Sequence, residues 1–306
     1  MPLPKVRRHR GVRRVTNKTV RPSAHADWVT EVQTPALRFS MAVNEILYQG
    51  RSDYQDIIVA DTKQFGRVLS LDGVFQTSDA EEWVYHEMIA HVPLYMHPHP
   101  ERVLIIGGGD GGCAREVLRH AEVASVDMVE IDAQVIQLAK KYFPRIASAL
   151  IEEPARLHLT VGDGLEKVAS ADNEYDVIIV DCSDPIGPGE GLFQRRFYQD
   201  ACRALKKGGL LVQQTDSPFL RGPLVHDIMH VMTSEFAYAR LYLAAIPIYP
   251  SGMHSFMVAS KGDDPLTIAR RPADIAPLRY YNDDIARAAF VLPNFVKTIL
   301  RERPES

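Results

Sequence analysis

The feature that most constrains the fold of this chain is an apolar run followed directly by a glycine-rich loop. Residues 103–106 read Val-Leu-Ile-Ile, and residues 107–112 read Gly-Gly-Gly-Asp-Gly-Gly. We expect a buried strand over 103–106 and a helix over 113–120. The loop contains the spacing Gly-x-Gly-x-x-Gly between a strand and a helix, which is typical of βαβ units that bind adenosine-containing ligands.

Strand and helix signals alternate along the chain after this loop. The sequence predicts strands at 126–130, 157–161, 177–180 and 210–214, and helices at 133–142 and 197–205, the latter stopped by Gly208 and Gly209. Parallel strands need crossover connections, so this alternation predicts an α/β fold with a Rossmann-like doubly wound sheet.

Residues 27–80 carry strand signals instead and are predicted to form a small N-terminal β domain. Asp72-Gly73 separates two short apolar runs, which predicts a hairpin with a type I′ turn. Helical spacing of apolar residues is expected over 81–96, at the start of the core domain, residues 81–306.

Composition and charge exclude several classes of function. The chain has 35 Lys and Arg against 39 Asp and Glu, a net charge of −4, which predicts no specific nucleic-acid partner. Residues 1–26 are expected to be a disordered basic tail, with adhesion to a polyanion or a transit peptide as alternatives. No apolar run is long enough for a membrane span or a signal peptide. The three cysteines form no Cys-x-x-Cys pair, which is typical of a cytoplasmic protein.

Two acids follow the apolar strand expected at 177–180. Asp181 and Asp184 stand three residues apart and precede a Pro- and Gly-rich loop that contains no Lys or Arg. Ligands bind at the carboxyl ends of strands in open α/β sheets, so the pair predicts a cationic substrate. The alternative is a strand end with Asp184 starting an Asp-Pro turn.

Three further acids occupy loop positions that suit a nucleoside with an amine tail. Glu130 ends the second strand of the core, where an acid binds ribose hydroxyls. Asp110 lies inside the glycine loop, where it disfavours a pyrophosphate or a ligand carboxylate and favours an amine; it could instead cap the following helix. Asp163, followed by Gly164, could accept a hydrogen bond from an adenine amino group, or it could simply cap the following helix.

His86 and His91 do not have the spacing of a metal site. They are five residues apart on the expected helix, about 140° around its axis, whereas paired metal ligands stand at i and i+4. We predict no bound metal.

Several stretches of the chain together resemble the spermidine synthases, the polyamine aminopropyltransferase family. The matching residues run in family order, at 66–73, 84–88, 103–112, 129–132, 181–188, 246–252 and 279–282. The resemblance implies a Rossmann-like, methyltransferase-type core with a small N-terminal β domain, assembled as a homodimer or homotetramer. It also implies transfer of the aminopropyl group of decarboxylated S-adenosylmethionine to putrescine or a similar diamine, giving spermidine and methylthioadenosine.

The resemblance also implies roles for individual residues, without a metal or tightly bound cofactor. Asp181 would be the catalytic proton acceptor. The nucleoside would be held by Gln55, Glu130, Asp163, Gly164 and Pro188, and the aminopropyl amine by Asp110. The diamine channel would be lined by Tyr85, His86, Asp181, Asp184 and Tyr249. The chain departs from many relatives at Ala286, where a His is common, and at His86, which is Gln in some.

Three alternatives remain at this stage. The acceptor could be cadaverine, agmatine or spermidine. The reaction could be N-methylation of putrescine by S-adenosylmethionine, which Asp110 argues against. The protein could also be a silent binding protein, which the presence of both Asp181 and Asp184 argues against.

Overall fold

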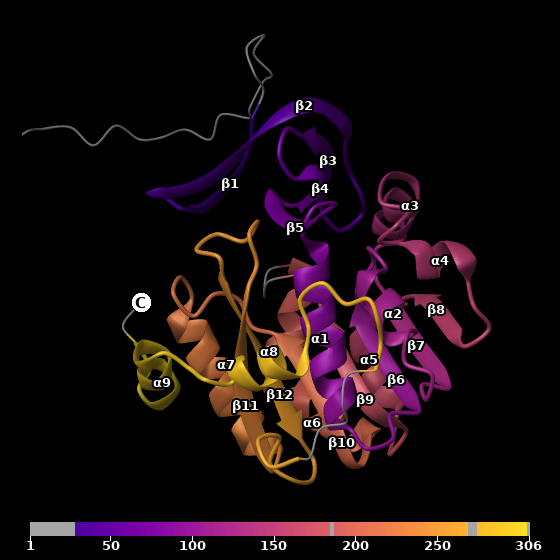
Figure 1. The fold of residues 1–306 in the computed structure, drawn as a ribbon, viewed down its shortest axis with the longest axis vertical. Coiled ribbons are helices and arrows are strands. Elements are labelled where there is room, and N and C mark those ends of the chain that lie inside the picture. Colours follow the sequence, from indigo (N-terminus) through magenta and orange to yellow (C-terminus); the bar gives the residue numbers. More distant parts are fainter. Residues whose placement is uncertain (1–27, 184–186, 269–273, 305–306) are drawn as a thin grey trace, which may run out of the picture.

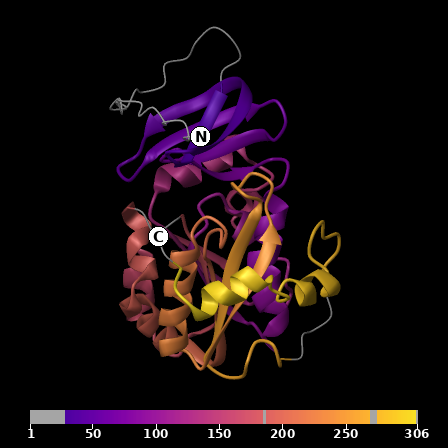
Figure 2. The same ribbon diagram turned by 90° about the vertical axis from the view of Figure 1, so that its left-hand side faces the viewer.

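The computed structural model describes residues 28–183, 187–268 and 274–304. Within these ranges the chain forms a five-stranded sheet and a seven-stranded sheet. Figures 1 and 2 show the smaller sheet, drawn in indigo, stacked on one end of the larger domain. The basic tail predicted at residues 1–26 lies outside the described residues.

The N-terminal sheet is an antiparallel meander in the order β1-β2-β3-β4-β5. Its strands are β1 (Trp28–Thr34), β2 (Leu37–Arg51), β3 (Asp56–Thr62), β4 (Gly66–Leu71) and β5 (Val74–Ser78). Asp72 and Gly73 both have positive φ, at 48° and 82°, and the flanking residues Leu71 and Val74 are paired. This two-residue loop with two left-handed positions confirms the predicted type I′ hairpin.

The larger sheet has the order β11-β12-β10-β9-β6-β7-β8. Its strands are β6 (Arg102–Gly107), β7 (Ser125–Glu130), β8 (Leu157–Val161), β9 (Tyr175–Asp181), β10 (Leu205–Gln214), β11 (Tyr238–Ala245) and β12 (Met253–Ser260). Strands β6 to β10 pair in parallel, and β12 and β11 add an antiparallel edge. The predicted doubly wound α/β sheet is therefore confirmed.

Helices cover both faces of this sheet. They are α1 (Glu82–Met96), α2 (Gly112–Val117), α3 (Ala133–Tyr142), α4 (Ser148–Glu152), α5 (Gly164–Ser170), the 3₁₀ helix η1 (Gly187–Phe193), α6 (Arg195–Ala204), α7 (Gly222–Glu235), α8 (Asp283–Ala288) and α9 (Asn294–Arg301). Successive side chains of a strand point to opposite faces. Val103 and Ile105 of β6 accordingly pack with α1 and α2, whereas Leu104 and Ile106 pack with α6 and α7. No described helix has the length and apolar character needed to cross a lipid bilayer.

The strand order reverses between β6 and β9, whose carboxyl ends lie side by side. Gly107 of β6 is paired with Asp181 of β9. A Cβ atom at Gly107 would lie 2.1 Å from the Asp181 carbonyl oxygen, and Gly107 has a φ of +84°. Only glycine fits this position, because both the close approach and the left-handed backbone exclude a side chain. Ligands of doubly wound sheets bind at such a reversal.

The prediction that Gly208 and Gly209 stop the preceding helix was wrong. Helix α6 ends at Ala204, and both glycines lie inside β10. The pairing of β10 with β9 shifts register between Leu205 and Leu210, and Gly208 has a φ of +79°. The glycines therefore form an irregularity within a strand rather than a helix stop, a role that glycine also has in sheets.

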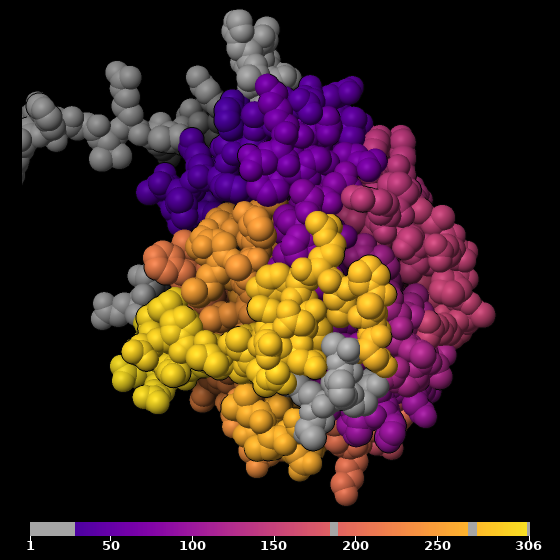
Figure 3. Space-filling view, viewed as in Figure 1, coloured from indigo at the N-terminus to yellow at the C-terminus, as the bar shows by residue number. Residues whose placement is uncertain are grey.

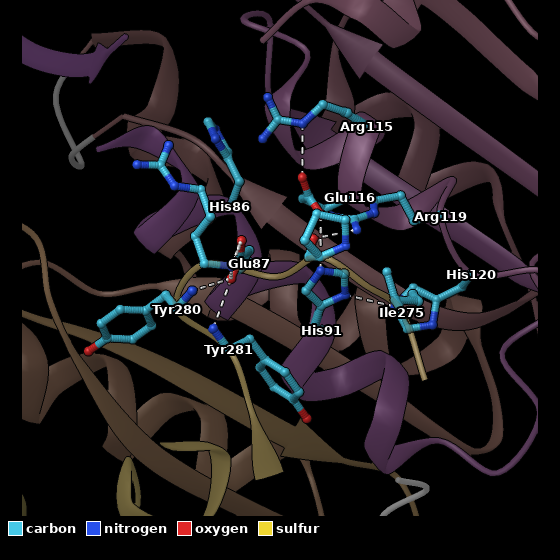
Figure 4. Close-up of polar contacts among 12 residues, drawn as sticks. His86, Glu87, His91, Arg115, Glu116, Arg119, His120, Ile275, Tyr280 and Tyr281 are labelled. Carbon is cyan, nitrogen blue, oxygen red and sulfur yellow. Dashed lines mark hydrogen bonds and ion pairs between the residues drawn. The ribbon is translucent and has the colours of Figure 1, made fainter. Parts of the chain in front are cut away.

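Helix α1 is held from outside by the segment that precedes α8. The Glu87 carboxylate accepts backbone N–H groups from Arg279, Tyr280 and Tyr281, at 2.8–2.9 Å for the shortest contact of each (Figure 4). The Arg279 guanidinium lies over the Trp83 ring, 4.2 Å from its centroid. In Figure 3 the yellow C-terminal residues cover much of the face on which α1 lies in Figure 1. The C-terminal segment thus closes the outer side of α1.

We predict that Glu87→Ala lowers the free energy of unfolding by about 2–4 kcal/mol, because it leaves three backbone N–H groups, one of them buried, without their acceptor. Urea unfolding followed by circular dichroism measures this change. Glu152→Ala, at an exposed site at the end of α4, is the control and should change stability by less than about 0.5 kcal/mol. Equal stability of the two variants would contradict the proposed anchoring role of Glu87.

Candidate active site

A pocket lies where the carboxyl ends of β6, β7 and β9 face the N-terminal sheet. Its walls combine the glycine loop after β6 with residues of β1, β5, α1 and the segment between β11 and β12. Among the described residues that line it there are several acids and no Lys or Arg. Such a pocket attracts a cationic ligand.

Asp181 is the last residue of β9 and faces into the pocket. Its Oδ1 accepts a hydrogen bond of 2.7 Å from the Tyr85 hydroxyl of α1. Its Oδ2 is buried and has no hydrogen-bond partner among the described residues. Burial and the nearby charge of Asp110 raise the pKa of Asp181 to about 6. The free oxygen can therefore hold a cation or accept a proton near neutral pH.

Asp110 contacts both the start of a helix and the pocket. Its Oδ1 accepts the N–H of Gly112, the first residue of α2, at 2.9 Å, and its Oδ2 lies 3.2 Å from His86 Nε2. Burial would raise the pKa of Asp110, but His86 and the Gly112 N–H lower it overall. The helix-cap interpretation and the pocket interpretation thus describe the two oxygens of one carboxylate.

Gly112, the third glycine of the Gly-x-Gly-x-x-Gly pattern, makes room for the His86 ring. A Cβ atom on Gly112 would lie 2.2–2.5 Å from three atoms of the His86 ring. The sequence pattern indicated a glycine loop around a nucleoside and gave no sign that the last glycine makes room for a histidine. His91 points elsewhere, toward Glu116 and His120, as Figure 4 shows.

Glu130 ends β7 and accepts two backbone N–H groups. Its Oε1 accepts from Asp132 at 2.9 Å, and its Oε2 accepts from Gly109 at 3.1 Å. Burial raises the pKa of Glu130 to about 7. Gln55, from the turn before β3, donates from Nε2 to the Asp132 carboxylate at 2.9 Å and also lines the pocket. The two predicted nucleoside contacts thus lie close together.

The remaining predicted residues have different outcomes. Asp163 caps α5 by accepting the Leu165 N–H at 2.8 Å, and Asp163 and Gly164 both line the pocket. Tyr249 lines it as well, with its hydroxyl donating to the Gln76 carbonyl at 2.8 Å. Asp184 and the side chain of Pro188 lie outside the described residues.

Among the polar residues of the pocket, sequence reasoning missed Glu31, Asp216 and His254. Glu31 on β1 is 1% exposed and accepts the Phe75 N–H at 2.9 Å. Asp216 follows β10, and His254 lies on β12. The pKa of His254 is lowered to about 3 by burial, so its imidazole is neutral. Glu31 left one usable signal, since it occupies an inward position in the alternation of β1.

Three side chains in the described ranges could together hold a cation. The ligand atoms of His86, Asp110 and Asp181 lie within 4.8 Å of one another. The two carboxylates in this arrangement suit the three N–H donors of an ammonium group.

Comparison with known families covers both sheets. The sequence model described as "Spermidine synthase tetramerisation domain" matches residues 27–79, and the one described as "Spermine/spermidine synthase domain" matches residues 82–268.

Individual relatives extend this match over most of the chain. A polyamine aminopropyltransferase of Caldicellulosiruptor bescii is 46% identical over 90% of this chain and 98% of its own length. One from Moorella thermoacetica is 46% identical over 91% of this chain and 97% of its own. A crystal structure of spermidine synthase with the transition-state analogue AdoDATO superposes with a TM-score of 0.87 at 38% identity, covering 93% of this chain and 98% of that one. Spermidine synthase from Thermotoga maritima gives a TM-score of 0.84 at 36% identity, with the same coverage.

We predict that Tyr85→Phe raises the pKa of Asp181 above about 6, by roughly 1, because the carboxylate loses the donor that stabilises its charged form. A ¹³C NMR titration of the aspartate carboxyls measures it. Tyr175→Phe is the matched control, since that hydroxyl donates to Asp127 near the opposite end of the strand. If the Asp181 pKa responds equally to both substitutions, the Tyr85 hydroxyl is not what stabilises the charged form of Asp181.

Proposed function

The chain belongs to the spermine/spermidine synthase family and is a polyamine aminopropyltransferase, and we propose that its acceptor is putrescine. The donor is decarboxylated S-adenosylmethionine, and the products are spermidine and methylthioadenosine. The observation that carries this proposal is the pairing of two half-buried carboxylates, Asp110 and Asp181, in a pocket without a described Lys or Arg. Two carboxylates can receive two amines, one from each substrate.

In this proposal the nucleoside occupies the side of the pocket below β7 and β8. Glu130 accepts from the ribose hydroxyls, because each of its oxygens has one further lone pair beyond its backbone N–H. Gln55 closes the ribose side, while Asp163 and Gly164 lie beside the adenine. The aminopropyl chain then extends toward Asp110, whose Oδ2 receives its ammonium group.

The acceptor amine is placed by Asp181. Free alkyl amines have pKa values near that of lysine, about 10.4, so the diamine arrives protonated and must lose a proton to attack. Asp181 holds the ammonium at its unpartnered Oδ2 and takes the proton as the new C–N bond forms. Tyr85 orients the carboxylate, and His86 and Tyr249 line the channel.

The donor itself supplies the activation for this reaction. A positive sulfonium makes the adjacent aminopropyl carbon electrophilic, and the leaving group is a neutral thioether. The protein's contribution is therefore to align the amine with that carbon and to exclude other orientations, which lowers barriers by about 7–11 kcal/mol in favourable cases. Glu31, which is buried, and Asp216, which is half-buried, lie on the N-terminal-sheet and β10 sides of the pocket and suit the far amine of the diamine.

We also propose that the enzyme is a homo-oligomer, a dimer or tetramer, assembled through its N-terminal sheet. This rests on the match of residues 27–79 to a tetramerisation domain. Trp28 and Val32 of β1, each 57% exposed, offer an apolar edge for such a contact.

We predict that Asp181→Asn lowers kcat by about 10²–10⁴-fold at saturating putrescine, because an amide keeps the shape but cannot take the proton. Spermidine and methylthioadenosine are quantified by mass spectrometry. Asp172→Asn, at an exposed position before β9, should leave kcat unchanged. Near-normal turnover by Asp181→Asn would show that Asp181 is not the catalytic proton acceptor. Formation of N-methylputrescine from S-adenosylmethionine would instead establish the methyltransferase alternative.

A further prediction concerns donor choice. We expect the enzyme to bind decarboxylated S-adenosylmethionine at least about 100-fold more tightly than S-adenosylmethionine, about 2.7 kcal/mol, because the extra carboxylate would face Asp110. Calorimetry with each donor gives the ratio of the two dissociation constants, and Asp110→Asn should bring this ratio closer to one. Asp163→Asn is the matched control, since it lies at the nucleoside and should weaken both donors alike. Equal affinity of the wild type for the two donors would contradict this account of Asp110.

A further inference from the structure

His86 lies between two carboxylates at the floor of the pocket. Its Nδ1 is 2.5 Å from Glu82 Oε2, and its Nε2 is 3.2 Å from Asp110 Oδ2. Both ring nitrogens face acceptor oxygens, an arrangement that satisfies an imidazolium with an N–H on each nitrogen. Burial alone would lower the pKa of His86, but Asp110 and Glu82 outweigh it and hold that pKa well above its usual value.

The ring is fixed in place by its surroundings. The His86 side chain is 3% exposed, and it packs so closely on Gly112 that no Cβ fits there. Glu82 is itself held by the Arg115 guanidinium through bonds of 3.0 and 2.8 Å. The titratable and charged groups that face or adjoin His86 are Glu81 at the N-cap of α1, Glu82 from α1, Asp110 from the glycine loop, Arg115 from α2 and Asp181 from β9.

The proposed function requires an ammonium group at this carboxylate. Asp110 Oδ1 accepts the Gly112 N–H, and Oδ2 faces His86 Nε2. An ammonium bound at this carboxylate and an imidazolium would be two like charges on one carboxylate, which disfavours their coexistence. A neutral His86 removes the conflict. With Nδ1–H donating to Glu82, its Nε2 lone pair can accept an N–H from the ammonium itself.

We propose that the substrate ammonium and the proton on His86 compete for Asp110, so that binding of decarboxylated S-adenosylmethionine expels that proton. His86 is then a positioning residue that is a donor in the empty enzyme and an acceptor in the complex. The proton leaves Nε2 for solvent, and no covalent bond changes. This inference rests on the proposed function, because it requires an amine-bearing donor at Asp110.

The sign of the resulting pH dependence follows from linkage. Below the pKa of His86 in the empty enzyme the ammonium must displace a proton, so its affinity rises with pH by up to about tenfold per pH unit. Above that pKa the imidazole is already neutral and affinity becomes constant. Methylthioadenosine has no amine, so its affinity should lack this dependence.

Calorimetric titrations between pH 7 and 9, each repeated in phosphate and Tris, test the proposal. The two buffers differ in ionisation enthalpy, so the difference in heat gives the number of protons released. We expect decarboxylated S-adenosylmethionine to release up to about one proton more than methylthioadenosine at the same pH. Methylthioadenosine has the same nucleoside, so any proton that Glu130 gains or loses on binding is the same for both ligands and drops out of the difference. The pH range avoids most of the titration of Asp181, whose pKa is about 6.

Three variants identify the group that releases the proton. His86→Gln should abolish the extra release, because an amide does not titrate, and should flatten the dependence of affinity on pH. Glu82→Gln should move the midpoint of that dependence to lower pH, since one of the two carboxylates that raise the His86 pKa becomes neutral. His254→Gln is the matched control from the same pocket and should keep the wild-type release, because His254 is already neutral.

The outcomes separate this inference from the proposed function. Equal proton release for the two ligands in the wild type, or extra release that persists in His86→Gln, overturns the competition. If the wild type still forms spermidine in the turnover assay, the proposed function stands while the inference fails. If the wild type binds methylthioadenosine but forms no spermidine, the proposed function fails, and the assay shows this independently of any proton count.

Discussion

The contact between Gly107 and Asp181 is the constraint on which the active site depends. It joins β6 to β9 at the point where the strand order reverses, and it brings the glycine loop within reach of the Asp181 carboxylate. A side chain at Gly107 would separate the two strand ends, because its Cβ would overlap the Asp181 carbonyl. The pairing of Asp110 with Asp181 across the pocket follows from this one close approach.

A second feature of the site is that its acids are stabilised by neutral donors, so that their negative charge remains available to a cationic ligand. Glu130 is stabilised by backbone N–H groups, and Asp181 by a tyrosine hydroxyl. Arginine neutralises Glu82 one layer further out, behind His86. Carboxylates in such surroundings are costly to leave empty and favourable to pair with a cation. We propose that the pocket thereby favours amines, and that the charge of His86 changes as an amine binds at Asp110.

Helix α1 connects this chemistry to the rest of the fold. Tyr85 and His86 face the pocket. The next residue, Glu87, points away from it and accepts hydrogen bonds from the backbone N–H groups of residues 279–281. Adjacent residues on a helix point about 100° apart, so one turn can serve two surroundings. The C-terminal segment therefore supports the position of the site residues without touching the pocket in the described part of the chain.

The sequence by itself determined the doubly wound sheet, the type I′ hairpin, the placing of Glu130 and Asp181 at strand ends and that of Asp110 in the glycine loop, because these depend on local periodicity and turn chemistry. It misassigned Gly208 and Gly209, since a glycine pair in a strand and one after a helix look alike without the neighbouring strand. Only the tertiary structure decided which distant groups meet. Glu31 and His254 reach the pocket from strands more than 200 residues apart in sequence. The charge of His86 depends on the distances to Glu82 and Asp110 and on burial, which no sequence spacing specifies.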